Sequence, residues 1–178
     1  MDALKDRIPD YARDLRLNIS SILTPQGALG LTEAQLWMVA FASAIAARNA
    51  DLARAIEDEA APHLSQAEIE AARSAAAIMG MNNVYYRFLH LVDDEEYAKL
   101  PARLRMNVIG SPGIPKADFE LVSLAVSAVN GCGKCVIAHE RMLRQHEVSR
   151  EAVQSAVRIA AVIHAIAGVL DYETARAA

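Results

Sequence analysis

Alanine occupies 35 of the 178 positions, and this abundance constrains the fold more than any other feature of the sequence. Alanine is the strongest helix former, whereas the aromatic residues that strands favour make up only 5% of the chain. Glycine, which weakens helices, occurs only eight times. A chain of this length can also bury a substantial core. We therefore expect an all-α, single-domain helical bundle that spans residues 1–178.

The charge balance and the chain start exclude several classes of protein. The 18 basic and 22 acidic residues give a net charge of −4, which removes the attraction to nucleic acid or to an anionic membrane. The apolar runs 37–47 and 159–170 are too short to span a bilayer. The first residues lack the basic-then-apolar order of a signal peptide, so we expect a cytoplasmic protein. In that reducing compartment, two cysteines indicate chemistry more often than a structural crosslink.

Capping residues and helix breakers divide the chain into helical segments. Thr32 and Ser65 each begin a capping box, and Ser149 is the expected N-cap of the last helix. The segment 111–115 holds two prolines and a glycine, which cannot continue a helix and so determine where the next one begins. The expected helices cover about residues 4–19 with a break at Pro9, 32–49, 51–62, 65–88 with a continuation or a bend at Gly80, 116–130, 132–145 and 149–170, and a solvated helix starts at 93–96.

A spacing of sixteen residues between a serine and a histidine occurs twice. It separates Ser74 from His90 and Ser123 from His139, each time across an alanine-rich segment. This spacing is compatible with an internally duplicated helical hairpin. Two similar alanine-rich helices explain it equally well.

A glutamate, two cysteines and a histidine form the most informative group of residues. At ~100° and ~1.5 Å per residue, Cys132, Cys135 and His139 share one side of a helix, with His139 one turn beyond Cys135. Glu120 lies eleven residues before the turn at Gly131, and His139 lies eight residues after it. Antiparallel packing therefore brings the carboxylate and the imidazole within about one helical turn of each other.

These residue types suit dithiol redox chemistry. A thiolate is the nucleophile, and a helix N-terminus, the nearby Lys134 and an imidazole all favour its formation. A second cysteine three residues away can attack a sulfenic acid or mixed disulfide on the first, and another dithiol reopens the resulting disulfide. The glutamate would hold the histidine in one tautomer and pass protons through it, because peroxide cleavage must protonate its leaving alkoxide or water. The expected catalytic residues are Glu120, Cys132, Cys135 and His139.

Other sites could use the same residues. A zinc site would take the two cysteines and His139 with Glu120 or His146, but no second CxxC or paired histidine completes a usual spacing. A c-type haem site needs histidine where Val136 stands, and a thioredoxin fold needs strands around the CxxC. We therefore expect no metal ligands and no bound cofactor.

Each residue also has a purely structural interpretation. The cysteines can be inert and buried, His139 can be a hydrogen-bonded core histidine, and Glu120 can be a solvated residue of a first helical turn. The residues that we expect to fill the core are Trp37, Met79, Met81 and Met106. Three polar residues, Asn82, Asn83 and Arg87, lie in an apolar stretch of the sequence. Two interpretations of them are equally compatible with the sequence: hydrogen bonds between packed helices, or contacts with a substrate.

The pattern of Glu120, Cys132, Cys135 and His139 resembles the E-x11-C-x2-C-x3-H motif of the alkyl hydroperoxidase D (AhpD) family, within the carboxymuconolactone decarboxylase-like superfamily. Similar stretches extend the resemblance over essentially the whole chain, at residues 11–12, 17–18, 76–87, 106–116 and 125–132. The resemblance implies an all-helical protomer, usually a homotrimer, with antioxidant activity that reduces alkyl hydroperoxides.

The resemblance also implies the electron path. Electrons come from dihydrolipoamide on the lipoyl domain of a dihydrolipoamide acyltransferase, which dihydrolipoamide dehydrogenase recharges, and the peroxiredoxin AhpC is the partner. By the same resemblance, Cys135 is the more exposed nucleophile, Cys132 is its resolving partner and proton donor, and Glu120 with His139 is the proton relay.

One position departs from similar proteins, which can carry a histidine between the cysteines. Here the intervening residues are Gly133 and Lys134, so this auxiliary titrating group is missing. Lys134 favours a thiolate electrostatically but does not shuttle protons near neutral pH. The alternative functions are a lactone decarboxylase, as the superfamily name suggests, and a zinc-binding structural helical protein.

Overall fold

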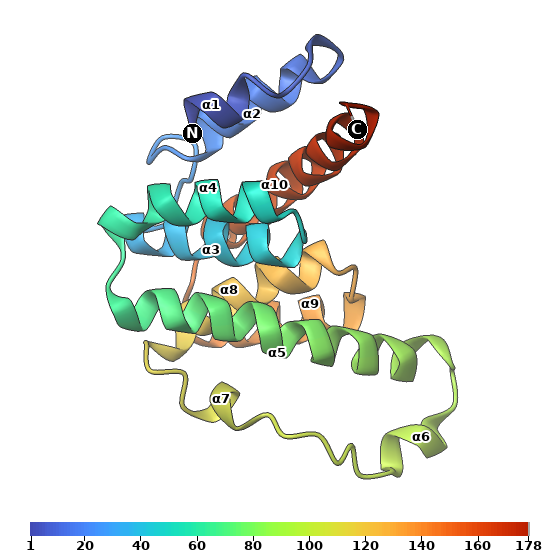
Figure 1. Cartoon of the computed structure of the whole chain (residues 1–178). Helices are drawn as coiled ribbons and strands as arrows, with labels where there is room; N and C mark the ends of the chain where they lie inside the picture. Colours follow the sequence, from blue (N-terminus) through green and yellow to red (C-terminus); the bar gives the residue numbers. More distant parts are fainter. Residues whose placement is uncertain (178) are drawn as a thin grey trace.

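The computed structural model describes residues 1–177, and every regular element within them is helical, as expected (Figure 1). The chain reverses direction repeatedly, so that helices distant in sequence pack side by side. The elements are α1 (Asp2–Lys5), η1 (Asp10–Ala12), α2 (Arg13–Ile22), α3 (Glu33–Ala46), α4 (Ala50–Ala60), η2 (Ala61–His63), α5 (Gln66–Leu91), α6 (Glu95–Lys99), α7 (Asn107–Gly110), α8 (Lys116–Val129), α9 (Gly133–Gln145) and α10 (Arg150–Ala177).

Local capping signals determine where the long helices begin. Thr32 and Ser65 both form the expected capping boxes, at the starts of α3 and α5. Ser149 accepts a hydrogen bond from the Ala152 amide at 3.1 Å, as expected of an N-cap. Asn49 caps α4 through the Leu52 amide. Because these side chains satisfy amides that have no partner inside the helix, each stabilises its helix by about 1 kcal/mol.

The core lies around α3 and α8, which are apolar on nearly all sides. Helix α3 packs against α4, α5, α8 and α10, and α8 packs against α3, α5, α9 and α10. Phe41 and Phe119 are among the largest buried side chains of this core. Helix α8 is therefore a rigid central element, and residues on it have well-determined positions relative to α9.

Helix α5 runs without interruption through Gly80, so the bend that this glycine allowed does not occur. Ser74 and His90 consequently lie on one helix, whereas Ser123 and His139 lie on two helices joined by a turn. The duplicated hairpin that the sixteen-residue spacing permitted is therefore not formed. Two alanine-rich segments explain that spacing.

The last helix, α10, extends beyond the apolar run seen in the sequence and ends at Ala177. It is the one helix of the described part of the chain that is long and apolar enough to cross a membrane, with a mean hydropathy of 1.7 over its most apolar window. Length and composition alone are weak evidence of a span, because core helices share them. Here α10 packs along α2, α3 and α8.

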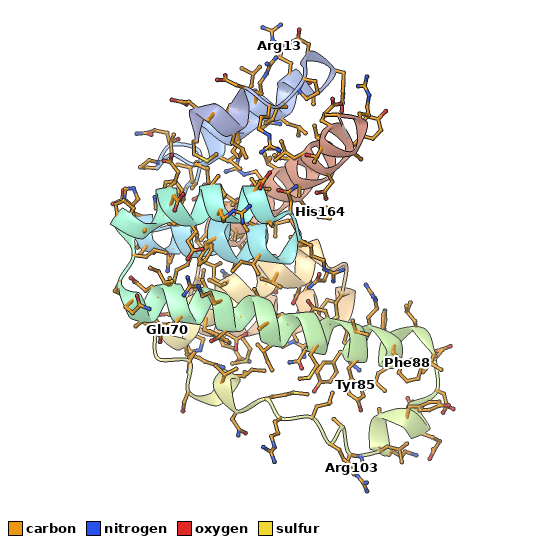
Figure 2. All side chains as sticks on the ribbon, viewed as in Figure 1. Arg13, Glu70, Tyr85, Phe88, Arg103 and His164 are labelled. Carbon is orange, nitrogen blue, oxygen red and sulfur yellow. A yellow bond between two sulfur atoms is a disulfide. The ribbon has the colours of Figure 1, made fainter. Side chains whose placement is uncertain are left out.

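The segment that carries α6 and α7 runs along α5 outside the main bundle (Figure 1). Tyr85 lies on the side of α5 that faces this segment, and Arg103 lies on the segment itself (Figure 2). Lys116, the first residue of α8, donates a hydrogen bond of 2.7 Å from Nζ to the Ile109 carbonyl. This bond ties α7 to α8 and positions α7 beside the site described next.

Candidate active site

A tight turn joins α8 to α9 and places their side chains face to face. Gly131 adopts a positive φ of 67°, which glycine adopts without steric cost. The Cys132 amide then donates to the Ser127 carbonyl at 3.1 Å, which closes the end of α8. Cys132 itself is the N-cap of α9, and its Sγ accepts the Cys135 amide at 3.3 Å. The turn therefore sets the antiparallel packing that the residue counts predict.

Cys132 and Cys135 are joined by a disulfide, with their Cα atoms 5.3 Å apart. Cys132 is fully buried, whereas 6% of the Cys135 surface is exposed. Cys135 is thus the sulfur that a reactant reaches first. Lys134, the charged residue between the two cysteines, is exposed to solvent.

Glu120 and His139 form a hydrogen-bonded pair next to the cysteines. The distance from His139 Nδ1 to Glu120 Oε2 is 2.6 Å, and Lys116 Nζ lies 3.0 Å from the other carboxyl oxygen. Only 4% of Glu120 is exposed, so its interpretation as a solvated first-turn residue is wrong. It is buried because α8 is covered on this side by α9.

The charge state of Glu120 determines the tautomer of His139. Burial raises the pKa of the Glu120 carboxyl, but the hydrogen bonds and positive charges of His139 and Lys116 outweigh burial, so its pKa lies below the ordinary value. An ionised carboxylate only accepts hydrogen bonds, so the Nδ1 of His139 carries a proton. The other ring nitrogen, Nε2, is left to take or give a proton.

A cavity of about 250 Å³ lies beside the disulfide. One of its walls is α9, which contributes Lys134, Cys135, Ala138 and His139. The sulfur of the more exposed cysteine and the imidazole therefore border the same space. A small substrate in this cavity would contact both groups.

Helices α5 and α7 form the opposite wall of the cavity. One face of α5 contributes Met79, Asn82 and Tyr86, which are spaced three and four residues apart. Ile109 comes from α7, and Met106 directly precedes that helix. Met79 is buried as expected, but it lines the cavity as well as filling the core. Of the residues in this wall, the sequence indicated only Asn82 as a candidate substrate contact, and the three-four spacing on α5 was the only signal for the others.

The polar residues Asn83 and Arg87 brace the turn before Cys132. Asn83 Nδ2 donates to Ser127 Oγ, and Asn130 Nδ2 donates to Asn83 Oδ1, both at 2.9 Å. Arg87 Nη1 donates to the Asn130 carbonyl at 2.7 Å. Of the two interpretations offered for Asn83 and Arg87, hydrogen bonds between packed helices are therefore the one that the structure shows. Asn82 belongs to the cavity instead.

No group of three or more His, Cys, Asp or Glu side chains in residues 1–177 is arranged to hold a metal ion. Within the disulfide, the two sulfurs are not thiolates, which are the form that binds zinc.

The fold and the site define an all-α protein with a CxxC disulfide beside a buried glutamate–histidine pair, a class distinct from the thioredoxin fold. Residues 95–175 match the Carboxymuconolactone decarboxylase family. The chain is 59% identical over 175 residues to alkyl hydroperoxide reductase AhpD of Rhodospirillum centenum, covering 98% of this chain and 92% of that protein. It therefore belongs to the AhpD family, as its motifs predict.

Two further relatives carry the same name. The AhpD of Gluconacetobacter diazotrophicus is 56% identical over 171 residues, which cover 96% of this chain and 92% of that protein. The AhpD of Brucella anthropi is 52% identical over 171 residues and 96% of both chains. The similarity thus extends over α5 and α7 as well as over the cysteine motif.

Proposed function

We propose that this protein is a dithiol peroxidase that reduces organic hydroperoxides through Cys132 and Cys135. The observation that carries the proposal is the cavity bordered by both Cys135 and His139, with Glu120 behind the histidine. The name alkyl hydroperoxide reductase, shared by relatives at 52–59% identity, supports the same reaction.

The oxidative half-reaction begins from the dithiol form. The Cys135 thiolate, in the first turn of α9 and beside Lys134, attacks the terminal oxygen of the hydroperoxide. The S–O bond forms, the O–O bond breaks, and Cys135 becomes a sulfenic acid. The Cys135 thiol gives its proton to His139 Nε2 as the thiolate forms, and His139 passes this proton to the departing alkoxide, which leaves as an alcohol. The sulfur of Cys132 then attacks Cys135 Sγ, the Cys132 thiol proton passes to the departing hydroxide, which leaves as water, and the disulfide closes.

In the reductive half-reaction, an external dithiol reduces the disulfide between Cys132 and Cys135. A thiolate of an external dithiol attacks the accessible Cys135 Sγ, and Cys132 leaves as a thiolate. The hydrogen bond from the Cys135 amide to Cys132 Sγ stabilises that developing charge. The second thiol of the donor then attacks the mixed disulfide, which releases an oxidised cyclic donor and the dithiol protein.

The electron donor that we propose is dihydrolipoamide on a lipoyl domain, with dihydrolipoamide dehydrogenase upstream. Cys135 is 6% exposed and lies beside a cavity of about 250 Å³, which the slender arm of a lipoyl group can enter. We also propose the peroxiredoxin AhpC as the downstream partner, which the resemblance to the AhpD family implies. The proposal also includes a homotrimeric assembly and a cytoplasmic location.

A coupled assay tests the proposal. Purified protein, dihydrolipoamide and tert-butyl hydroperoxide should give hydroperoxide loss that matches dihydrolipoamide oxidation in stoichiometry. Replacing dihydrolipoamide with glutathione should slow the reaction strongly, because a monothiol cannot release itself from the mixed disulfide by cyclisation. Hydroperoxide loss with neither donor preference nor thiol consumption would contradict the proposal.

The family match also favours a second candidate, a lactone decarboxylase, because that activity gives the family its name. Decarboxylation requires no dithiol cycle. Protein alkylated on both cysteines after reduction separates the two activities: lost hydroperoxide turnover supports the peroxidase, and retained turnover of a carboxymuconolactone supports the decarboxylase. Metal analysis of protein purified without chelators tests the zinc-binding alternative.

A further inference from the structure

Two neighbouring asparagines on α5 have opposite environments. Both side chains are buried, but the amide of Asn83 makes hydrogen bonds with Ser127 and Asn130. The Oδ1 atom of Asn82 is buried without a hydrogen-bond partner among the described residues, and only 4% of this residue is exposed. Asn82 borders the cavity that also contains Cys135 and His139.

The other two buried side-chain oxygens without a partner in residues 1–177 belong to Ser43 and Ser123. Both are hydroxyls inside helices, α3 and α8, where a small rotation allows a bond to the carbonyl one turn earlier. The Asn82 amide has no such local solution. A buried polar group without a partner costs stability, and such groups are rare away from functional sites. Asn82 therefore has the properties of a ligand-binding group.

We propose that Asn82 binds the hydroperoxide, its Oδ1 accepting a hydrogen bond from the terminal O–H of the substrate. This inference rests on the proposed function, because it assigns a residue to the oxidative half-reaction. The hydroperoxide places an O–H group at one end of an alkyl chain. The apolar side chains of Met79, Met106 and Ile109 on the same wall accommodate that chain.

The hydrogen bond is retained while the bonds change. The Cys135 thiolate forms the S–O bond to the terminal oxygen, the O–O bond breaks, and His139 supplies the proton that converts the alkoxide to an alcohol. The hydrogen on the terminal oxygen stays there, so Asn82 Oδ1 accepts first from the hydroperoxide and then from the sulfenic acid of Cys135. Asn82 thus orients the O–O bond between the attacking sulfur and the proton donor.

The reducing substrate does not need this acceptor. A thiol S–H is a weak donor, and the attacking form of the dithiol is a thiolate, which has no hydrogen to donate. Asn82 should therefore discriminate between the two substrates of the cycle.

Steady-state kinetics of Asn82→Leu tests the proposal. In a ping-pong cycle, kcat/KM for each substrate depends only on its own half-reaction. For Asn82→Leu, kcat/KM for tert-butyl hydroperoxide should fall about five- to tenfold, the effect of one neutral hydrogen bond, while kcat/KM for dihydrolipoamide stays unchanged. The Tm should stay the same or rise, because leucine has the same branched arrangement of heavy atoms and removes an unpartnered polar group. Asn82→Ala repeats the kinetic test with a smaller side chain.

Ser43→Ala is the matched control, because it also removes a buried unpartnered oxygen but lies on α3 outside the cavity lining. Both kcat/KM values should equal those of the wild type. An unchanged hydroperoxide kcat/KM in both Asn82 variants would overturn the inference, and so would an equal fall for both substrates together with a lower Tm. If the reduced wild type does not react with hydroperoxide, the proposed function fails and this inference fails with it.

Discussion

The two walls of the cavity beside Cys135 differ in how the chain builds them. One wall comes from α9, and Glu120 on α8 supports it from behind through His139. These residues, within 120–139, carry the charged and sulfur-containing groups. The opposite wall comes from residues 79–109 on α5 and α7, and it is apolar except for Asn82 and Tyr86. Under the proposed function, this difference assigns bond making to one wall and substrate selection to the other. Substitutions on the two walls should therefore have separable effects.

The largest effects belong to the sulfur atoms. Cys135→Ser should abolish hydroperoxide consumption, because the accessible nucleophile is lost. Cys132→Ser should retain a single turnover, since Cys135 still forms a sulfenic acid that nothing resolves. Mass spectrometry after one addition of hydroperoxide measures both outcomes. If Cys135→Ser consumed hydroperoxide and Cys132→Ser did not, the two sulfur roles would be reversed.

Removing the charge behind the histidine should have the next largest effect. Glu120→Gln keeps the side-chain volume but no longer holds His139 as a proton donor. We expect kcat/KM for tert-butyl hydroperoxide to fall about 10²-fold, at the lower end of the usual contribution of general acid–base catalysis. Asp118→Asn is the control, with the same charge change on α8 at a residue that contacts Gln35. Equal effects of the two substitutions would indicate a general electrostatic role instead.

A change on the opposite wall should alter substrate preference more than rate. Ile109→Trp fills part of the cavity of about 250 Å³. We expect kcat/KM for cumene hydroperoxide to fall about tenfold relative to that for hydrogen peroxide, as is usual for a steric change in an apolar pocket. Val108→Trp, on the same short helix outside the cavity lining, should leave the ratio unchanged. An unchanged ratio in Ile109→Trp would place substrate selection elsewhere.

The smallest expected effect is on the pH dependence of stability. The pKa of Glu120 is lower than normal in the folded protein, so the folded state binds fewer protons than the unfolded state. The resulting stabilisation is complete above the unfolded pKa of about 4.3 and is lost as the pH falls through the folded value. Urea unfolding below about pH 5 should therefore show a steeper loss of stability for wild type than for Glu120→Gln. Parallel pH curves would contradict the ion-pair account of this site.

The sequence predicts the chemical wall because its signals are local. The counts from Gly131 to Glu120 and His139 place the two side chains together once an antiparallel hairpin is assumed, and the distance of 2.6 Å agrees. The capping boxes at Thr32 and Ser65 depend on three-residue contacts, so α3 and α5 begin where expected. A single sequence does not decide whether Gly80 bends a helix, because packing against α3 and α8 determines it.

What the sequence alone determines here is the all-helical class, the principal helix starts and the row of sulfur, imidazole and carboxylate, since each depends on helical periodicity over a few turns. Tertiary structure decides that Glu120 is buried, that Cys135 rather than Cys132 reaches the cavity, and that Asn82 and Asn83 have different environments. The physical reason is that burial and cavities arise where helices distant in sequence meet, and the chain order of residues 79–139 does not specify how closely those helices pack.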